Sequence, residues 1–160
     1  DEKTALDGMI KAEPDPGATI IWELNFSGAR NYFVNLLAAN DPASTYSVYK
    51  QLEPRIDNTQ LCIFLNTRDD RRYRTHQMLD LVFNKIKPAM MIVRGEKLPA
   101  QFHNYQKENP GIKTLQLPYK SSIVEISQTF STLKGYYIVG IGNMVGWGEQ
   151  FMQDLKKYRA

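Results

Sequence analysis

The stretch NYFVNLLAANDPAST, residues 31–45, decides the fold, because an apolar run gives way abruptly to polar residues within it. We expect a buried strand to end here and a helix to begin, which places Asn40, Asp41 and Ser44 at the junction. In an open α/β sheet, ligands bind where the C-terminal ends of strands meet the N-termini of helices. The stretch therefore predicts an α/β fold. At the junction we expect either a ligand site or only a helix cap formed by Asp41 or Ser44.

A second junction of the same kind, NTRDDR at residues 66–71, follows the next apolar run. It opens a segment rich in arginine, with Arg68, Arg71, Arg72 and Arg74. One interpretation is a solvated helix start, in which acidic residues favour the positive end of the helix dipole. The other is an anion site, because the forked guanidinium group of arginine suits phosphate and carboxylate. The residues alone leave both interpretations open.

Apolar segments bounded by Pro, Gly and Asn predict six strands, at 18–24, 31–38, 61–66, 89–94, 112–117 and 136–141. The connection between the first two is too short for a crossover, so this pair should be antiparallel. Each later gap holds apolar residues at helical spacing, which implies parallel strands joined by right-handed crossovers. We therefore expect a single Rossmann-like α/β domain over residues 18–160, with a mainly parallel six-stranded sheet, one antiparallel edge strand and helices on both faces. Residues 1–17 are predicted to form a linker or lead-in.

Composition narrows the function classes. The chain has 160 residues, of which 42% are hydrophobic, and a net charge of +3, which is too small to indicate nucleic acid by itself. Its one cysteine, Cys62, lies in an apolar segment and excludes an internal disulfide or a cysteine-based metal site. No group of acidic and histidine residues has metal-ligand spacing, so no metal site is predicted. No apolar run approaches the ~20 residues that a membrane-spanning helix needs.

The glycine-rich segment 140–148 invites a dinucleotide-binding interpretation, but Val145 stands where the third glycine of that motif belongs. We expect a tight turn from strand to helix that requires positive φ, or a loop that presents Asn143 and Trp147 to a ligand or partner. The phosphate-loop pattern Gly-x-x-x-x-Gly-Lys-Ser/Thr is absent from the sequence. The chain therefore lacks the usual phosphate cradle.

Four segments together resemble a known family: residues 14–18, 33–45 and 66–71, and residues 139–143 followed by Gly146 and Gly148. They resemble, in the same order, the C-terminal part of the ligase subunit of bacterial poly-γ-glutamate synthase, which is similar to the Mur ligases. The resemblance implies a Mur-ligase C-terminal-like α/β domain of an ATP-dependent amide ligase. Such enzymes phosphorylate a carboxylate with ATP, and an amine then attacks the acyl phosphate. ATP and Mg²⁺ would be bound mainly by a separate N-terminal domain over which this one closes.

The resemblance also implies roles for individual residues. Arg68 and Arg71 would be catalytic. A nucleotide-binding role falls on Asn40, Asp41, Ser44 and Asp69, and a substrate-facing or partner-facing role falls on Arg72, Arg74 and Asn143. Asn40 occupies the place where Mur ligases often have His, and Leu37 the place where they often have Asp.

The implied partners are the N-terminal ATP-binding domain of the same ligase, glutamate or poly-γ-glutamate, and membrane subunits of the synthase. Such a protein would lie peripherally on the cytoplasmic side of the bacterial membrane, and this domain alone would be inactive. One alternative is a non-catalytic α/β binding or assembly module. Another is a basic RNA-binding domain, but only Tyr73 is interleaved among the arginines as a stacking platform. We therefore expect no nucleic-acid partner.

Overall fold

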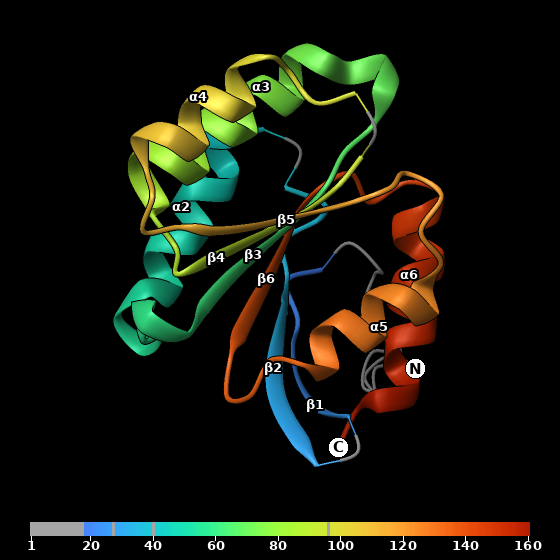
Figure 1. The fold of residues 1–160 in the computed structure, drawn as a ribbon. Helices are drawn as coiled ribbons and strands as arrows, with labels where there is room; N and C mark the ends of the chain where they lie inside the picture. The colour runs from blue at the N-terminus through green and yellow to red at the C-terminus, as the bar shows by residue number, and fades with distance from the viewer. Residues whose placement is uncertain (1–17, 27, 40, 96) are drawn as a thin grey trace, which may run out of the picture.

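A six-stranded sheet forms the centre of the computed structural model, which describes residues 18–26, 28–39, 41–95 and 97–160 (Figure 1). Its strand order is β1-β2-β6-β3-β4-β5. Edge strand β1 pairs with β2 antiparallel, and all other neighbours are parallel. The strands are β1 (Ile21–Phe26), β2 (Ala29–Asn35), β3 (Leu61–Asn66), β4 (Met90–Arg94), β5 (Lys113–Leu117) and β6 (Tyr137–Gly142). The predicted fold class, including the antiparallel edge, is confirmed.

Helices cover both faces of this sheet (Figure 1). One face carries α2 (Pro42–Leu52), α3 (Arg72–Asp80), which continues as the π-helix η4 (Leu81–Ile86), and α4 (Gln101–Glu108). The other face carries α5 (Ile123–Ser131) and α6 (Trp147–Leu155). The remaining helical segments are single 3₁₀ turns: η1 (Glu53–Arg55), η2 (Asn58–Gln60), η3 (Asp69–Arg71) and η5 (Lys156–Tyr158). Because both faces are covered, the central strands need apolar residues on both sides.

Strand β3 shows this requirement most clearly, since all of its residues are buried. Phe64 points into the layer of α5 and α6, where its ring packs against Phe130 and Phe151. Leu65 points the other way, into the layer of α2, α3 and α4. Cys62 is a buried free thiol on the Phe64 side, and burial raises its pKa, as expected of an inert core residue.

The first two strands differ in extent from the sequence-based expectation of 18–24 and 31–38. Their pairing continues until Phe26 faces Ala29, and Gly28 just before Ala29 has a φ of 99°, which glycine adopts without strain. Residues 36–38, which were expected to belong to the second strand, lie outside the sheet. The observed ends of β1 and β2 differ from the expected ends by two or three residues. Residues 1–17, predicted to be a linker, lie outside the described residues. None of the helices in the described ranges has the length and apolar character needed to cross a bilayer.

Candidate functional site

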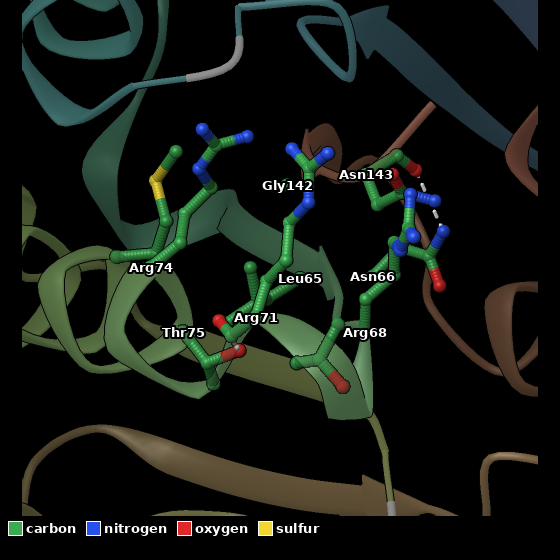
Figure 2. Close-up of a pocket in the computed structure, with 10 residues that line it drawn as sticks. Leu65, Asn66, Arg68, Arg71, Arg74, Thr75, Gly142 and Asn143 are labelled. Carbon is green, nitrogen blue, oxygen red and sulfur yellow. Dashed lines mark hydrogen bonds between the residues drawn. The ribbon is translucent and has the colours of Figure 1, made fainter. Parts of the chain in front are cut away.

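A small, open cleft lies at the C-terminal edge of the sheet, between the ends of β3 and β6 and the start of α3 (Figure 2). The chain after β3 leads to α3 on one face of the sheet, whereas the chain after β6 leads to α6 on the other face. Diverging connections of this kind leave a crevice between them. The cleft is lined by Leu65, Asn66, Thr67, Arg68, Arg71, Arg74, Thr75, Met78, Gly142 and Asn143.

The floor of the cleft is fixed by the register of three strand ends. Asn66 pairs with Gly142 on one side and with Arg94 on the other. The side-chain amide of Asn66 donates to the carbonyl oxygen of Asn143 (2.7 Å), and the Asn143 backbone N–H donates to the carbonyl of Asn66 (2.9 Å). These two bonds join the ends of β3 and β6.

A glycine turn after β6 presents Asn143 to the cleft. Gly142 has φ 102° and Gly146 has φ 75°, so the predicted tight turn with positive φ is confirmed. The side-chain amide of Asn143 donates to the carbonyl of Val145 (2.7 Å), which closes the turn. The Gly146 N–H donates to the carboxylate of Glu149 (3.2 Å) at the start of α6.

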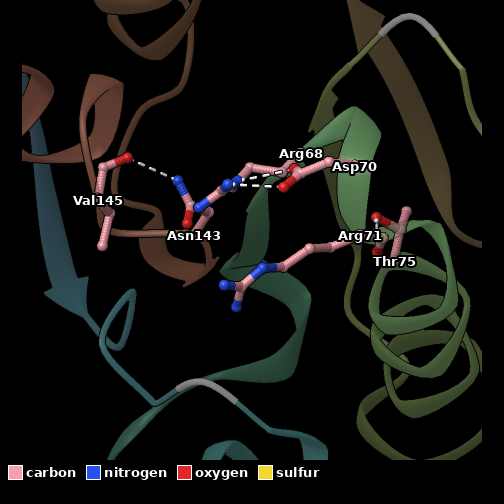
Figure 3. A network of polar contacts seen from close by, with 6 residues as sticks. All are labelled: Arg68, Asp70, Arg71, Thr75, Asn143 and Val145. Atoms are coloured by element: carbon pink, nitrogen blue, oxygen red, sulfur yellow. Dashed lines mark hydrogen bonds and ion pairs between the residues drawn. The ribbon is translucent and has the colours of Figure 1, made fainter.

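Arg68 forms a two-pronged ion pair with Asp70 (Figure 3). Its Nε lies 2.9 Å from Oδ1 and its Nη2 lies 2.7 Å from Oδ2 of the carboxylate. These hydrogen bonds lower the pKa of Asp70 and raise the pKa of Arg68. The pair holds the guanidinium group beside Asn143 (Figures 2 and 3). Because arginine has five N–H donors, the pair still leaves donors for an anion in the cleft.

Arg71 and Arg74 enter the cleft from the start of helix α3. Figure 2 shows their guanidinium groups in a row with that of Arg68, on one side of the pocket. Within the described part of the chain, Arg71 has no ion-pair partner. Cations at a helix N-terminus oppose the helix dipole, so a local helix-start role does not explain this row. The forked guanidinium groups of such a row are suited to bind an anion between them.

The first predicted junction, at the start of α2, lies next to this row. Asp41 caps the helix, because its carboxylate accepts from the backbone N–H of Ser44 (2.9 Å). This bond is the main cause of the lowered pKa of Asp41, and the positive charge of Arg74 also contributes. Asn40, predicted to bind nucleotide, lies outside the described residues.

The structure thus brings together four of the predicted site residues, Arg68, Arg71, Arg74 and Asn143. As far as described residues form it, the lining does not include Asp41, Ser44, Asp69 or Arg72. The nucleotide-binding and substrate-facing roles of all these residues stay predictions.

Sequence reasoning missed three residues at this edge. Asn66 and Thr67 belong to the quoted junction, but no role was expected for them. Arg94, the last residue of β4, donates to Asn66 from beneath the cleft (2.9 Å). Its position at the end of a predicted strand, at the same edge of the sheet, was the available signal.

Comparison with known proteins agrees with the family resemblance seen in the sequence. The family model of the poly-gamma-glutamate synthase CapB C-terminal domain matches residues 21–158. The chain is 32% identical over 162 residues to the PGA synthase CapB of Bacillus subtilis (strain 168), covering 100% of this chain and 41% of that protein. It is also 32% identical over 151 residues to the capsule biosynthesis protein CapB of Bacillus anthracis, covering 93% of this chain and 32% of the other. The chain therefore spans less than half the length of these relatives.

Two solved structures share the fold. Folylpolyglutamate synthase from Thermotoga maritima superposes with a TM-score of 0.58 at 17% identity, covering 96% of this chain and 34% of that one. A murein peptide ligase from Psychrobacter arcticus 273-4 superposes with a TM-score of 0.57 at 16% identity, covering 86% of this chain and 29% of that one. In both cases this fold is one part of a much longer chain.

Proposed function

Because this chain belongs to the family of poly-gamma-glutamate synthase CapB C-terminal domains, we propose that it is the C-terminal domain of an ATP-dependent amide ligase that polymerises glutamate. In the proposed reaction a glutamate carboxylate attacks the terminal phosphorus of ATP, and ADP leaves. The amine of another glutamate then attacks the acyl phosphate, and phosphate leaves as the amide forms. An N-terminal domain would hold ATP, and this domain would close over it.

The row of Arg68, Arg71 and Arg74 is the observation that carries this proposal. Phosphoryl transfer develops charge on the transferred oxygens, and prepositioned cations stabilise that charge. Asp70 prepositions Arg68, since two hydrogen bonds fix the plane of its guanidinium group. Arg68 and Arg71 are therefore the proposed catalytic residues.

The cleft suits phosphate oxygens better than it suits a metal ion. Its lining offers guanidinium and amide N–H donors. Across the described ranges, no group of three or more His, Cys, Asp or Glu side chains could hold a metal ion. The lining, as far as it is described, contains no carboxylate, and we propose that Mg²⁺ is held, with most of the ATP contacts, by the N-terminal domain. We assign no step of the reaction to Mg²⁺ here.

The same positive charge suits an acidic polymer. Arg72 and Arg74 lie on the first turn of α3, and we propose that they and Asn143 face glutamate or poly-γ-glutamate as it reaches the cleft. Rim charges of this kind chiefly steer association, so their effect should weaken with salt. Membrane subunits as partners, and a peripheral place on the cytoplasmic side of the membrane, belong to the same proposal.

Replacing Arg68 in the complete gene product tests the proposal. We expect Arg68→Ala to lower glutamate-dependent phosphate release by about 100-fold, the scale of losing one prepositioned donor to a transition state. The matched control is Arg30→Ala, because Arg30 pairs with Glu23 at the start of β2, at the opposite edge of the sheet. Equal rates in the two variants would remove Arg68 from the catalytic site. If the unmodified gene product releases no phosphate with glutamate, the non-catalytic assembly module would replace the ligase.

A further inference from the structure

Arg94 is a buried cation directly beneath the cleft. It ends strand β4, next to Asn66 of β3, and only 3% of its surface is exposed. Its guanidinium group lies between two aromatic rings, 4.5 Å from the centre of Tyr119 and 3.9 Å from that of Trp147. It donates through Nη1 to Asn66 Oδ1 (2.9 Å) and through Nη2 to the carbonyl oxygen of Tyr119.

Such an environment is costly for a charge. No acidic side chain pairs with Arg94 among the described residues, and its Nε has no hydrogen-bond partner there. Burial lowers its pKa, which shows that the surroundings disfavour the cation. Even a buried ion pair, in which each charge has a partner, can often be replaced by apolar residues without loss of stability. Stability of the fold is therefore a poor reason for an arginine at this position.

The contacts of Arg94 suggest a different role, because arginine can only donate hydrogen bonds. Arg94 therefore holds the oxygen of the Asn66 amide toward itself and turns the amide nitrogen toward Asn143, whose carbonyl accepts at 2.7 Å. The carbonyl oxygen of Arg94 also accepts from Thr67, from the backbone N–H (3.1 Å) and from Oγ1 (2.8 Å). The three residues that these bonds reach, Asn66, Thr67 and Asn143, all line the cleft.

We propose that Arg94 is a positioning residue that sets the geometry of the cleft by fixing the amide of Asn66 and, through it, the Asn143 turn. Arg68 lies beside Asn143, so a displaced turn would change the place where an anion meets the guanidinium row (Figure 3). The rings of Tyr119 and Trp147 hold the guanidinium group in the required plane. The kinetic part of this inference rests on the proposed ligase function.

Two hydrogen bonds form a relay, from Arg94 to Asn66 and from Asn66 to Asn143. One substitution interrupts this relay at Arg94 and another interrupts it at Asn66. Arg94→Met removes the charge and the donors while it keeps most of the apolar stem. Asn66→Ala removes both the oxygen that Arg94 holds and the N–H that reaches Asn143, and it adds no charge to the cleft. If Arg94 acts through Asn66, the two variants and their combination should show the same defect. If Arg94 served only in packing, the effects of the two substitutions would be additive.

The first measurement needs no substrate. In this chain, NMR hydrogen exchange should show a protected Asn66 side-chain amide, with exchange at least tenfold faster in Arg94→Met. Unchanged exchange would overturn the relay, whatever the enzyme activity proves to be. Thermal melting identifies a variant that fails to fold. If Arg94→Met fails to fold, the result rests on Asn66→Ala, in which the backbone amide signals of the turn 142–146 should shift, and unshifted signals would overturn the relay.

The second measurement uses the complete gene product. We expect each variant to lower kcat by about tenfold while KM for ATP changes less than twofold, because misplaced groups weaken the transition state more than binding by another domain. The double variant should be no worse than either single variant, and Arg30→Met should match the unmodified enzyme. Additive losses, or a change confined to KM, would overturn the proposal. Absence of ligation in the unmodified enzyme would refute the proposed function but leave the exchange result standing.

Discussion

At the scale of single residues, the ion pair of Arg68 with Asp70 serves to orient the guanidinium group and not to stabilise the fold. Its ion pair with Asp70 is largely at the surface, where the Asp70 side chain is 61% exposed, so the pair contributes little to stability. Its value lies in orientation, because a bidentate pair fixes the plane of the guanidinium group. An incoming anion then meets a prepositioned donor instead of a mobile chain.

This pair predicts a pH dependence that is confined to acid. Hydrogen bonds from Arg68 lower the pKa of Asp70 below its ordinary 3.8. Because the pKa is lower in the folded chain than in the unfolded chain, the small stabilisation is present above pH 3.8 and is lost as the pH falls through the lowered pKa. NMR titration of the Asp70 carboxyl carbon should give a midpoint below 3.8 that returns toward 3.8 in Arg68→Ala. A midpoint of 3.8 or higher in the unmodified chain would show that the ion pair does not form in solution.

The residues of the cleft could be predicted only in part. Arg68 and Arg71 stand out in the sequence, because clustered arginines at a strand-to-helix junction have few local explanations. Arg94 has no such local signal, since its burial depends on Tyr119 and Trp147, which come from other parts of the chain. The residue type of Asp41 allows both a cap and a ligand contact, and the structure shows the cap.

At the scale of elements, the turn between β6 and α6 depends on glycine for space as well as for conformation. A Cβ atom on Gly142 would lie 2.4 Å from the carbonyl oxygen of Asn66, and the backbone there has φ 102°. The close approach is what lets Asn66 and Asn143 exchange hydrogen bonds. The glycine therefore serves the cleft directly.

Gly142→Ala should destabilise the fold by about 2–3 kcal/mol, because a strained φ and a close contact with the backbone of β3 combine. Urea unfolding followed by circular dichroism measures the loss. The matched control is Gly111→Ala, since an added Cβ there would meet nothing within 4 Å. That control should change the free energy of unfolding by less than about 1 kcal/mol. Equal effects of the two substitutions would mean that the turn relaxes easily.

Element types were more predictable than their ends. Each strand overlaps an apolar segment of the sequence, and the amphipathic spacing of the helices follows from covering a sheet. The ends of β1 and β2 depend on cross-strand pairing, which apolar content does not reveal. The apolar residues Val82, Phe83 and Ile86 predict that the helix continues to Ile86, but nothing in the sequence shows that this last part, η4, is a π-helix.

At the scale of the whole molecule, the cleft follows from where β6 is inserted. The last strand lies between β2 and β3, so its C-terminal end meets that of β3. Gly140 makes this insertion possible, because a Cβ atom there would lie 2.6 Å from the ring of Phe33. Strand order could not be predicted, since the apolar segment of β6 resembles the others and pairing depends on packing across both layers.

A cleft formed by one domain of a ligase predicts that this chain binds anions but does not turn over ATP. Its three cleft arginines attract phosphate, whereas the sequence contains no phosphate-loop pattern to orient a triphosphate. We expect inorganic tripolyphosphate to bind weakly to the 160-residue chain, with an affinity that falls as salt rises, and we expect no phosphate release from ATP and glutamate. Calorimetry and a phosphate assay measure the two quantities, with Arg71→Ala weakening binding and Arg30→Ala leaving it unchanged. Turnover by the chain alone would place the whole reaction within this domain and refute the division between two domains.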